Sequence, residues 1–385
     1  MPHPNTIEIL ERLIAFDTTS CNSNLALMDY LKQYLGSYGV TSHLIFDHEH
    51  RKANLYATIG PQDHGGVMLS GHTDTVPVTG QNWTKPPYTL SKAADHYYGR
   101  GTSDMKGFIA VVLASIPDLA KTKLHTPIHL AFSYDEEIGC VGVRSLIDTL
   151  RQHPVKPAIC IIGEPTSMKV ATAHKGKIAG QITVRGKECH SGMAPKGVNA
   201  VNYAARLVVW LENLARDKRL NGPFDERYEI PFSTIHTGVI QGGTVLNIVP
   251  NHCHLVFEIR YISEENTKRI LDQLDNYAHD LTTEMATIDK DCGITIEITT
   301  EYPGLDTEDE AEVVSFVSKL VQSTDKISIN FGSEGGLFSS TLHIPTVVCG
   351  PGSMDQGHKP DEFIHAKQLE LCEDFVHRLA QELSV

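Results

Sequence analysis

The chain has 385 residues, of which 41% are hydrophobic and 21% charged, and its formal net charge is -14. This length exceeds what one hydrophobic core usually serves, so we expect two domains. The acidic balance argues against nucleic acid as a partner, because phosphate binding needs clustered Lys and Arg. No apolar run approaches the ~20 residues of a membrane span, which argues against a membrane partner.

The first residues of the chain predict an amphipathic helix rather than a secretory signal. Ile7, Leu10, Leu13 and Ile14 recur at helical spacing, with charged residues between them. The eight cysteines are scattered and form no C-x-x-C pair. Such cysteines are typical of reduced thiols in a reducing compartment, so the expected location is the cytoplasm.

Strand-like and helix-like segments alternate in the first half of the chain. This alternation predicts an α/β domain with a mainly parallel central sheet. The predicted strands are Asn54–Ile59, Val67–Ser70, Ile128–Ser133 and Ala158–Ile162, and the predicted helices are Leu25–Tyr38, Lys106–Leu119 and Cys140–Arg151. The stretch His43–His50 is predicted to be a solvated loop, because its three histidines follow no metal-ligand spacing.

The pattern changes at about Lys177, where a β-α-β-β-α-β order begins that fits a ferredoxin-like α+β layer. Its predicted elements are Ile178–Val184, Asn199–Ala215, Thr234–Ile240, His252–Tyr261, Glu264–Met285 and Ile294–Thr300. The α/β alternation then returns, with predicted elements Ile327–Phe331, Ile344–Cys349 and Lys367–Leu383. We therefore predict a discontinuous α/β domain of residues 1–177 and 302–385, with an inserted domain of residues 178–301.

The segment Ser70–Asp74 offers the first possible metal ligand. Residues two apart in an extended segment point the same way, so Asp74 can reach one ring nitrogen of His72 while the other nitrogen binds a metal. A carboxylate in that position fixes the tautomer of a ligating His and raises its basicity. Taken alone, a capping Asp beside a structural His explains this pair better.

Carboxylates follow three further predicted strands. Asp104 lies in the Gly-rich segment Gly99–Gly107, where its alternative role is a helix N-cap. Glu136 and Glu137 face opposite ways if the chain is extended there, so one could bind metal and the other could face a reacting water. Two adjacent buried carboxylates are costly without a cation, whereas a solvated acidic turn is not. Glu164 ends another apolar strand, where open α/β sheets bind ligands.

His358, in the Gly-rich loop Gly350–Pro360, completes the set, although alone it would be an incidental surface residue. The joint occurrence of His, Asp, Glu, Glu and His at strand ends predicts two cations bridged by one carboxylate. Mixed imidazole and carboxylate ligands suit Zn²⁺ and its neighbours better than Mg²⁺ or Ca²⁺. Two such metals would lower the pKa of a bridging water and polarise a carbonyl.

These motifs together resemble the M20 family of di-metal aminoacylases, deacetylases and peptidases, over nearly the whole chain. The resemblance implies two divalent ions, Zn²⁺ first and Co²⁺ or Mn²⁺ as alternatives. The implied ligands are His72, Asp104 and Glu164 for one ion and Asp104, Glu137 and His358 for the other, with Asp104 as the bridge. Glu136 resembles the general base and acid of the family, and Asp74 the carboxylate behind the ligating His. The family pattern also places a cis peptide at Asp104-Met105.

The inserted domain has matching motifs of its own, which imply a lid and dimerisation domain. The segment His190–Ala200 resembles one whose His reaches the neighbouring active site of a homodimer and helps to hold the oxyanion. Asn247 and Arg260 lie in segments that resemble substrate contacts, so they are expected to bind carboxylate or amide groups. The alternatives are a polar residue at the start of a lid helix for His190 and a surface pair with Glu258 for Arg260.

Three stretches, Ala131–Glu137, Thr172–Gly176 and Val347–Gly352, resemble the acetylornithine deacetylase branch of the family, whereas Phe331–Gly336 departs slightly from it. The expected reaction is hydrolysis of a small N-acyl amino acid by a metal-bridged hydroxide. The first expected substrate is N2-acetyl-L-ornithine, a substrate of arginine biosynthesis. Succinyl-diaminopimelate desuccinylase, or another aminoacylase or dipeptidase activity, is the nearest alternative. A catalytically inactive, metal-stabilised binding protein is disfavoured because Glu136 is retained, and no Gly-x-Ser-x-Gly elbow indicates a serine hydrolase.

Overall fold

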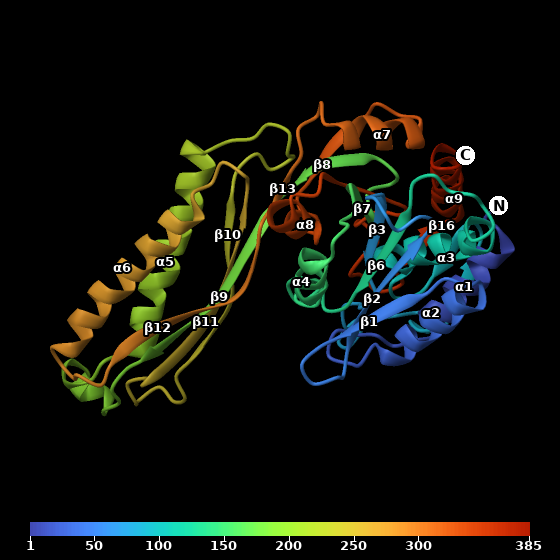
Figure 1. Cartoon of the computed structure of the whole chain (residues 1–385). Coiled ribbons are helices and arrows are strands. Elements are labelled where there is room, and N and C mark those ends of the chain that lie inside the picture. The colour runs from blue at the N-terminus through green and yellow to red at the C-terminus, as the bar shows by residue number, and fades with distance from the viewer. The chain divides into compact units, whose positions relative to one another are not determined.

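The computed structural model describes all 385 residues, which divide into two compact units. Unit 1 comprises Met1–His174, Leu305–Ile329 and Ser333–Val385, and unit 2 comprises Lys175–Gly304 and Asn330–Gly332. Each unit has its own sheet and its own buried hydrophobic cluster (Figure 1). The predicted fold class, a mixed α/β domain plus an inserted ferredoxin-like domain, is confirmed.

The main sheet of unit 1 has nine strands in the order β1-β2-β6-β3-β7-β15-β8-β13, with β14 paired to β8. These strands are β1 (Ser42–Phe46), β2 (Ala53–Ile59), β3 (Val67–His72), β6 (Ile128–Ser133), β7 (Ile159–Pro165), β8 (Val170–His174), β13 (Leu305–Asp306), β14 (Lys326–Ile329) and β15 (Thr346–Gly350). The central strands β6, β3, β7 and β15 run parallel, so their carboxyl ends meet at one edge of the sheet. A smaller sheet joins β4 (Ser91–Ala93), β5 (His96–Tyr98) and β16 (Phe363–His365).

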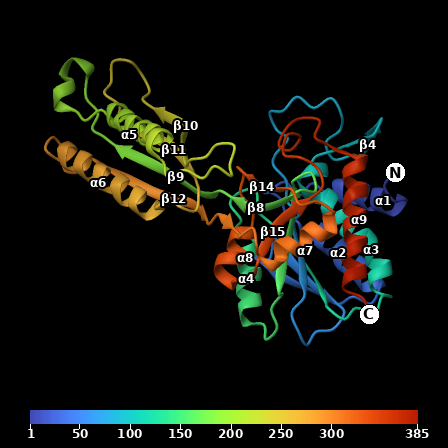
Figure 2. The same cartoon turned by 90° about the horizontal axis from the view of Figure 1, so that it is seen from above.

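Helices cover both faces of the main sheet. One group shares a buried hydrophobic cluster with the sheet and consists of α1 (Pro4–Ile14), α2 (Leu25–Ser37), α3 (Gly107–Leu119), α7 (Glu312–Val321) and α9 (Ala366–Glu382). In Figure 2, α4 (Val143–Gln152) and α8 (Gly335–Leu342) lie together on the opposite side of the sheet from α3 and α9. The central strands β3, β6, β7 and β15 are buried on both faces, which is why they are almost wholly apolar in sequence.

Unit 2 has a four-stranded antiparallel sheet in the order β10-β11-β9-β12. Its elements are β9 (Gly176–Arg185), η2 (Ser191–Lys196), α5 (Ala200–Asn221), β10 (Thr234–Gly242), β11 (His252–Tyr261), α6 (Thr267–Ala286) and β12 (Gly293–Tyr302). Buried residues alternate along β9 with half-buried ones, because α5 and α6 cover one face of the sheet only. None of the helices in either unit combines the length and the apolar composition that a membrane span needs.

The structure corrects the prediction of a loop at His43–His50. Residues Ser42–Phe46 form β1, which pairs antiparallel with β2 at the edge of the sheet, with Leu44 opposite Leu55. The edge strand is only partly buried, so it includes polar residues and lacks the apolar pattern that predicts a strand. The predicted start of α4 at Cys140 is also wrong, because a turn occupies the residues before Val143.

Candidate metal centre

The carboxyl ends of the parallel strands hold the first candidate ligands. His72 is the last residue of β3 and pairs in register with Ser133 at the end of β6. Glu164 lies near the end of β7, which is the other parallel neighbour of β3. Both side chains are almost fully buried, with 1% of His72 and 2% of Glu164 exposed. The sheet therefore fixes their separation through its backbone hydrogen bonds.

Asp104 reaches the same place from η1 (Thr102–Lys106), an irregular π-helical segment ahead of α3. Gly101 has φ of 85°, a left-handed conformation that favours glycine. A side chain at Gly107 would lie 2.5 Å from the Thr102 carbonyl oxygen, so glycine is needed there as well. The peptide bond Asp104-Met105 is cis, as the family resemblance implied.

The Asp104 carboxylate lies between the two candidate histidines. Its Oδ1 is 3.0 Å from Nε2 of His72, and its Oδ2 is 3.1 Å from Nε2 of His358. The Oε1 of Glu164 is 3.4 Å from the His72 nitrogen, and the Oε2 of Glu137 is 2.9 Å from the His358 nitrogen. The five side chains thus form two donor groups that share Asp104, which is the arrangement expected of a bridging carboxylate.

The spacing and the chemistry of these donors fit two divalent cations. Ligands at about 2.1 Å from a tetrahedral Zn²⁺ lie roughly 3.4 Å from one another, close to the separations described above. Burial raises the pKa of Glu164 to about 8 and that of Glu137 to about 7, and repulsion by Asp104 adds to both shifts. Cations between these groups would offset that repulsion. The set of two imidazoles and three carboxylates suits Zn²⁺, Co²⁺ or Mn²⁺.

Asp74 differs from its predicted arrangement. The rear nitrogen of His72, Nδ1, is 3.0 Å from the main-chain carbonyl of Asp74, whereas the Asp74 carboxylate is 3.5 Å away. That carboxylate instead accepts hydrogen bonds from the backbone N–H groups of Glu136 and Glu137, at 3.1 and 3.2 Å, and from the hydroxyl of Ser20. Asp74 therefore still lies behind His72, but its carboxylate holds the backbone of the loop that contains Glu136 and Glu137.

Glu136 and Glu137 lie in a turn, not in extended chain, so the expectation that they face opposite ways does not apply. The turn starts after Asp135, whose φ is 54° and whose carboxylate pairs with Lys52. Glu137 contributes to one candidate ligand group, and a carboxylate oxygen of Glu136 lies within 4.8 Å of donor atoms of His72 and Glu164. Burial raises the pKa of Glu136 well above its usual value. Both carboxylates therefore face the cluster.

Two residues that support this site had no signal in the sequence. Glu362 is 1% exposed and accepts hydrogen bonds from the backbone N–H groups of Gly101, Ser103 and Asp104. It also pairs with the fully buried Arg100 at 2.6 Å. Cys140 donates a hydrogen bond from Sγ to Oε1 of Glu136 at 3.4 Å. Burial, and the nearby Glu136, raise the pKa of the Cys140 thiol well above its usual value, so it stays protonated.

The remaining predicted residues, His190, Asn247 and Arg260, belong to unit 2. His190 is exposed and precedes η2, and its Nδ1 accepts a hydrogen bond from the N–H of Gly192. The N–H of Ser191 donates to the Asn247 carbonyl at 3.0 Å, so these two segments lie side by side. Arg260 on β11 contacts Glu258 at 3.3 Å and the hydroxyl of Tyr302 at 3.0 Å.

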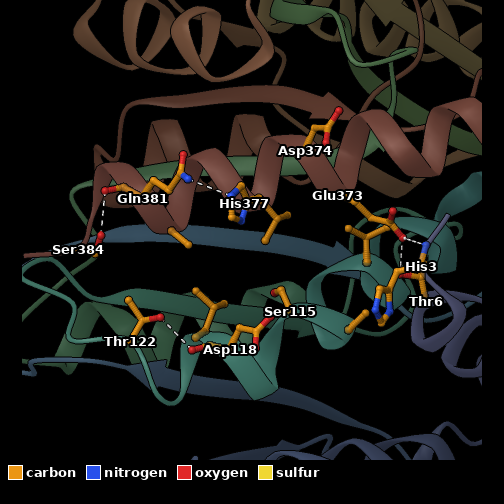
Figure 3. Close-up of a pocket in the computed structure, with 15 residues that line it drawn as sticks. His3, Thr6, Ser115, Asp118, Thr122, Glu373, Asp374, His377, Gln381 and Ser384 are labelled. Carbon is orange, nitrogen blue, oxygen red and sulfur yellow. Dashed lines mark hydrogen bonds between the residues drawn. The ribbon is translucent and has the colours of Figure 1, made fainter. Parts of the chain in front are cut away.

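A separate groove of unit 1 lies between α3 and α9 and has a volume of about 520 Å³ (Figure 3). Several of its polar side chains form hydrogen bonds with other residues that line the groove. Glu373 accepts from Thr6 and from the N–H of His3, and His377 contacts Gln381 on the same helix. None of the candidate ligands lines this groove, so it does not serve the metal centre.

A central parallel sheet with imidazoles and carboxylates gathered at its strand ends defines an α/β protein with a candidate metal centre. The chain belongs to peptidase family M20/M25/M40, whose model matches residues 68–382. An acetylornithine deacetylase of Pasteurella multocida is 32% identical to this chain over 387 residues. The match covers 98% of this chain and 97% of that protein.

Solved structures show the same fold. An M20 family metallo-carboxypeptidase of Sulfolobus solfataricus superposes with a TM-score of 0.79 at 17% identity, covering 98% of this chain and 99% of that one. A dinuclear metal-binding peptidase of the M20 family from Bacillus subtilis gives a TM-score of 0.68 at 14% identity, covering 98% and 97%. The family match and the curated relatives confirm the predicted family and its likeness to acetylornithine deacetylases, and the chain is a hydrolase of this family that acts on small molecules.

Proposed function

We propose that this protein hydrolyses the amide bond of a small N-acyl amino acid, and that N2-acetyl-L-ornithine is its substrate. The products would be acetate and L-ornithine, which would serve arginine biosynthesis. The observation that carries the proposal is the Asp104 carboxylate between His72 and His358, with Glu136 beside it. The relatives named acetylornithine deacetylase support the choice of substrate.

The substrate can be tested by turnover of the metal-loaded protein on a panel. The panel comprises N-acetylornithine, other N-acetyl amino acids, N-succinyl-diaminopimelate and dipeptides. We expect the highest kcat/KM on N-acetylornithine, and complementation of an arginine auxotroph that lacks this deacetylase. A clear preference for N-succinyl-diaminopimelate would instead identify a desuccinylase.

We assign the proton transfers of the reaction to Glu136. Two divalent cations held by the ligand cluster would lower the pKa of a coordinated water and polarise the amide carbonyl. Glu136 takes a proton from the attacking water and then delivers it to the nitrogen of the leaving amine. Its position favours this role, because a carboxylate oxygen of Glu136 lies within 4.8 Å of donor atoms of His72 and Glu164, where it can reach a coordinated water. The Asp74 carboxylate accepts the backbone N–H of Glu136, so the backbone from which the base extends is held in place.

We propose that His190 contributes to the active site of a partner chain in a homodimer that forms through unit 2. Because Nδ1 of His190 accepts from Gly192, the proton of a neutral imidazole lies on Nε2, which can donate to an oxyanion. Side chains close to His190 in this unit are apolar and exposed, with Leu246 100% and Ile248 42% exposed. Such a patch is typical of a protein interface.

His190→Ala is expected to lower kcat by about 10²-fold without dissociating the dimer, because it removes one oxyanion donor. The measurement is steady-state kinetics together with the mass of the particle in solution. His236→Ala, which alters another exposed histidine of unit 2, is the matched control and should behave as wild type. A monomeric wild-type enzyme with full turnover would contradict the proposal.

Arg260 is proposed to bind the α-carboxylate of the substrate, since its fork suits bidentate pairing, with Asn247 as a further polar contact. Arg260→Ala is expected to raise KM by roughly 10- to 100-fold, the equivalent of losing a hydrogen bond to a charged group. Because Arg260 also contacts Glu258 and Tyr302, the Tm is measured in parallel. The exposed Arg269 provides the control Arg269→Ala. Unchanged KM and kcat in Arg260→Ala would refute the assignment, and the same assay on Asn247→Ala tests that residue.

We also propose a cytoplasmic location, which the unpaired state of all eight cysteines supports. Recovery of the native protein from a secreted or periplasmic fraction would contradict it.

A further inference from the structure

The side chain of Glu136 folds back over its own turn onto Cys140. The N–H of Cys140 donates to the Glu136 carbonyl at 2.8 Å, which closes the turn. The thiol of Cys140 then donates to Oε1 of the Glu136 carboxylate at 3.4 Å. Cys140 is fully buried, at 0% exposed, so its position is fixed by the packing around it. A buried donor is thereby aimed at one oxygen of the proposed base.

We propose that Cys140 is a positioning residue for the general base, whose thiol holds Oε1 of Glu136 and leaves Oε2 for the reacting water. This inference rests on the proposed role of Glu136. Cys140 itself touches neither substrate nor metal, and it takes no part in bond making. It acts only through the rotamer of the glutamate.

The other contacts of this loop explain why such a residue is needed. Asp74 accepts the N–H groups of Glu136 and Glu137, and Lys52 pairs with Asp135, so the backbone is held from two sides. None of these contacts restrains the side-chain torsions of Glu136. A catalytic group displaced by 1 Å can cost about 10²-fold in rate. A thiol is a weak donor, so it can hold the carboxylate without withdrawing much of its basicity.

The test compares Cys140→Ala with Cys140→Ser. Removal of the donor in Cys140→Ala is expected to lower kcat by about tenfold, a fraction of the loss that a full 1 Å displacement can cause. KM should change less than about twofold, and the metal content and metal affinity should equal those of wild type. Cys140→Ser keeps a donor and should restore kcat to within about threefold of wild type. Both variants keep a Cβ, so the φ of 53° at this position affects them equally.

Two controls separate positioning from a structural role. Cys372→Ala removes another fully buried thiol, on α9, and should lower Tm without changing kcat. Glu136→Asp shortens the base and withdraws it from the thiol, so adding Cys140→Ala in that background should have no further effect on kcat. If Cys140→Ala lowers only Tm, or Cys140→Ser is as impaired as Cys140→Ala, the inference is overturned while the role of Glu136 stands. If Glu136→Ala remains active, the result instead refutes the proposed role of Glu136, on which this inference rests.

Discussion

Replacing Glu136 with Ala is expected to lower kcat by at least 10²- to 10⁴-fold, the usual contribution of a positioned general base. The neighbouring ligand carboxylates are not free to replace it. Glu137, Glu164 and Asp104 each have an oxygen within 3.4 Å of a candidate ligand imidazole, so cations would occupy them. The Glu136 carboxylate has no such pairing, and its hydrogen-bond partner is the Cys140 thiol. The loss should therefore fall on the proton transfers and leave metal binding intact.

The measurement combines steady-state kinetics with metal analysis of the same preparation. Glu136→Ala should carry the metal content of wild type, and its KM should change little. Glu137→Ala is the matched control, because it removes the adjacent carboxylate and should lose metal as well as turnover. Near-normal turnover in Glu136→Ala would refute its role, and loss of metal in this variant would show that Glu136 is a ligand instead.

Asp104→Ala is expected to abolish the binding of both metals and all turnover. Its two oxygens face different histidines, at 3.0 and 3.1 Å, so its removal takes one ligand from each donor group. It also leaves Glu137 and Glu164 without the shared carboxylate that would bridge their cations. His72→Ala and His358→Ala each remove a ligand from one group only, and should each retain part of the metal.

The measurement is metal content after desalting, followed by titration of the chelator-treated wild type with Zn²⁺, Co²⁺ and Mn²⁺. We propose Zn²⁺ as the native metal, and metal analysis of untreated protein tests that choice. Metal binding should also raise the Tm of wild type in proportion to the logarithm of metal concentration, and this rise should be lost in Asp104→Ala. An active Asp104→Ala enzyme with two bound metals would contradict the bridging role.

The strand ends were predictable because apolar runs are a local signal. His72 and Glu164 each follow several buried residues of a parallel strand, and both lie at the expected edge of the sheet. Such runs are almost wholly apolar where both faces of the strand are buried. The edge strand β1 was missed because it is only partly buried, so its sequence lacks that signal.

The supporting contacts could not be predicted, because they depend on geometry that spacing does not encode. Residues two apart share a direction in extended chain, which led to the expected contact between the Asp74 carboxylate and His72. The chain bends after His72, so the Asp74 carbonyl takes that place. Glu362 contacts backbone groups about 260 residues away in sequence, and no local pattern identifies such a partner. The contact of Cys140 with Glu136 depends on the left-handed backbone conformation of Cys140, which spacing does not reveal either.

Glu362 also sets the order in which the site can be assembled during protein synthesis. The backbone N–H groups of Gly101, Ser103 and Asp104 emerge from the ribosome early, but the carboxylate that accepts them comes near the end of the chain. His358, the partner of Asp104, comes equally late. A nascent chain of about 350 residues therefore has the sheet and most of the ligands, but neither the second histidine nor the acceptor of the η1 loop. Metal bound at that stage would occupy an incomplete site, so the hydrolase can become active only after translation has nearly ended.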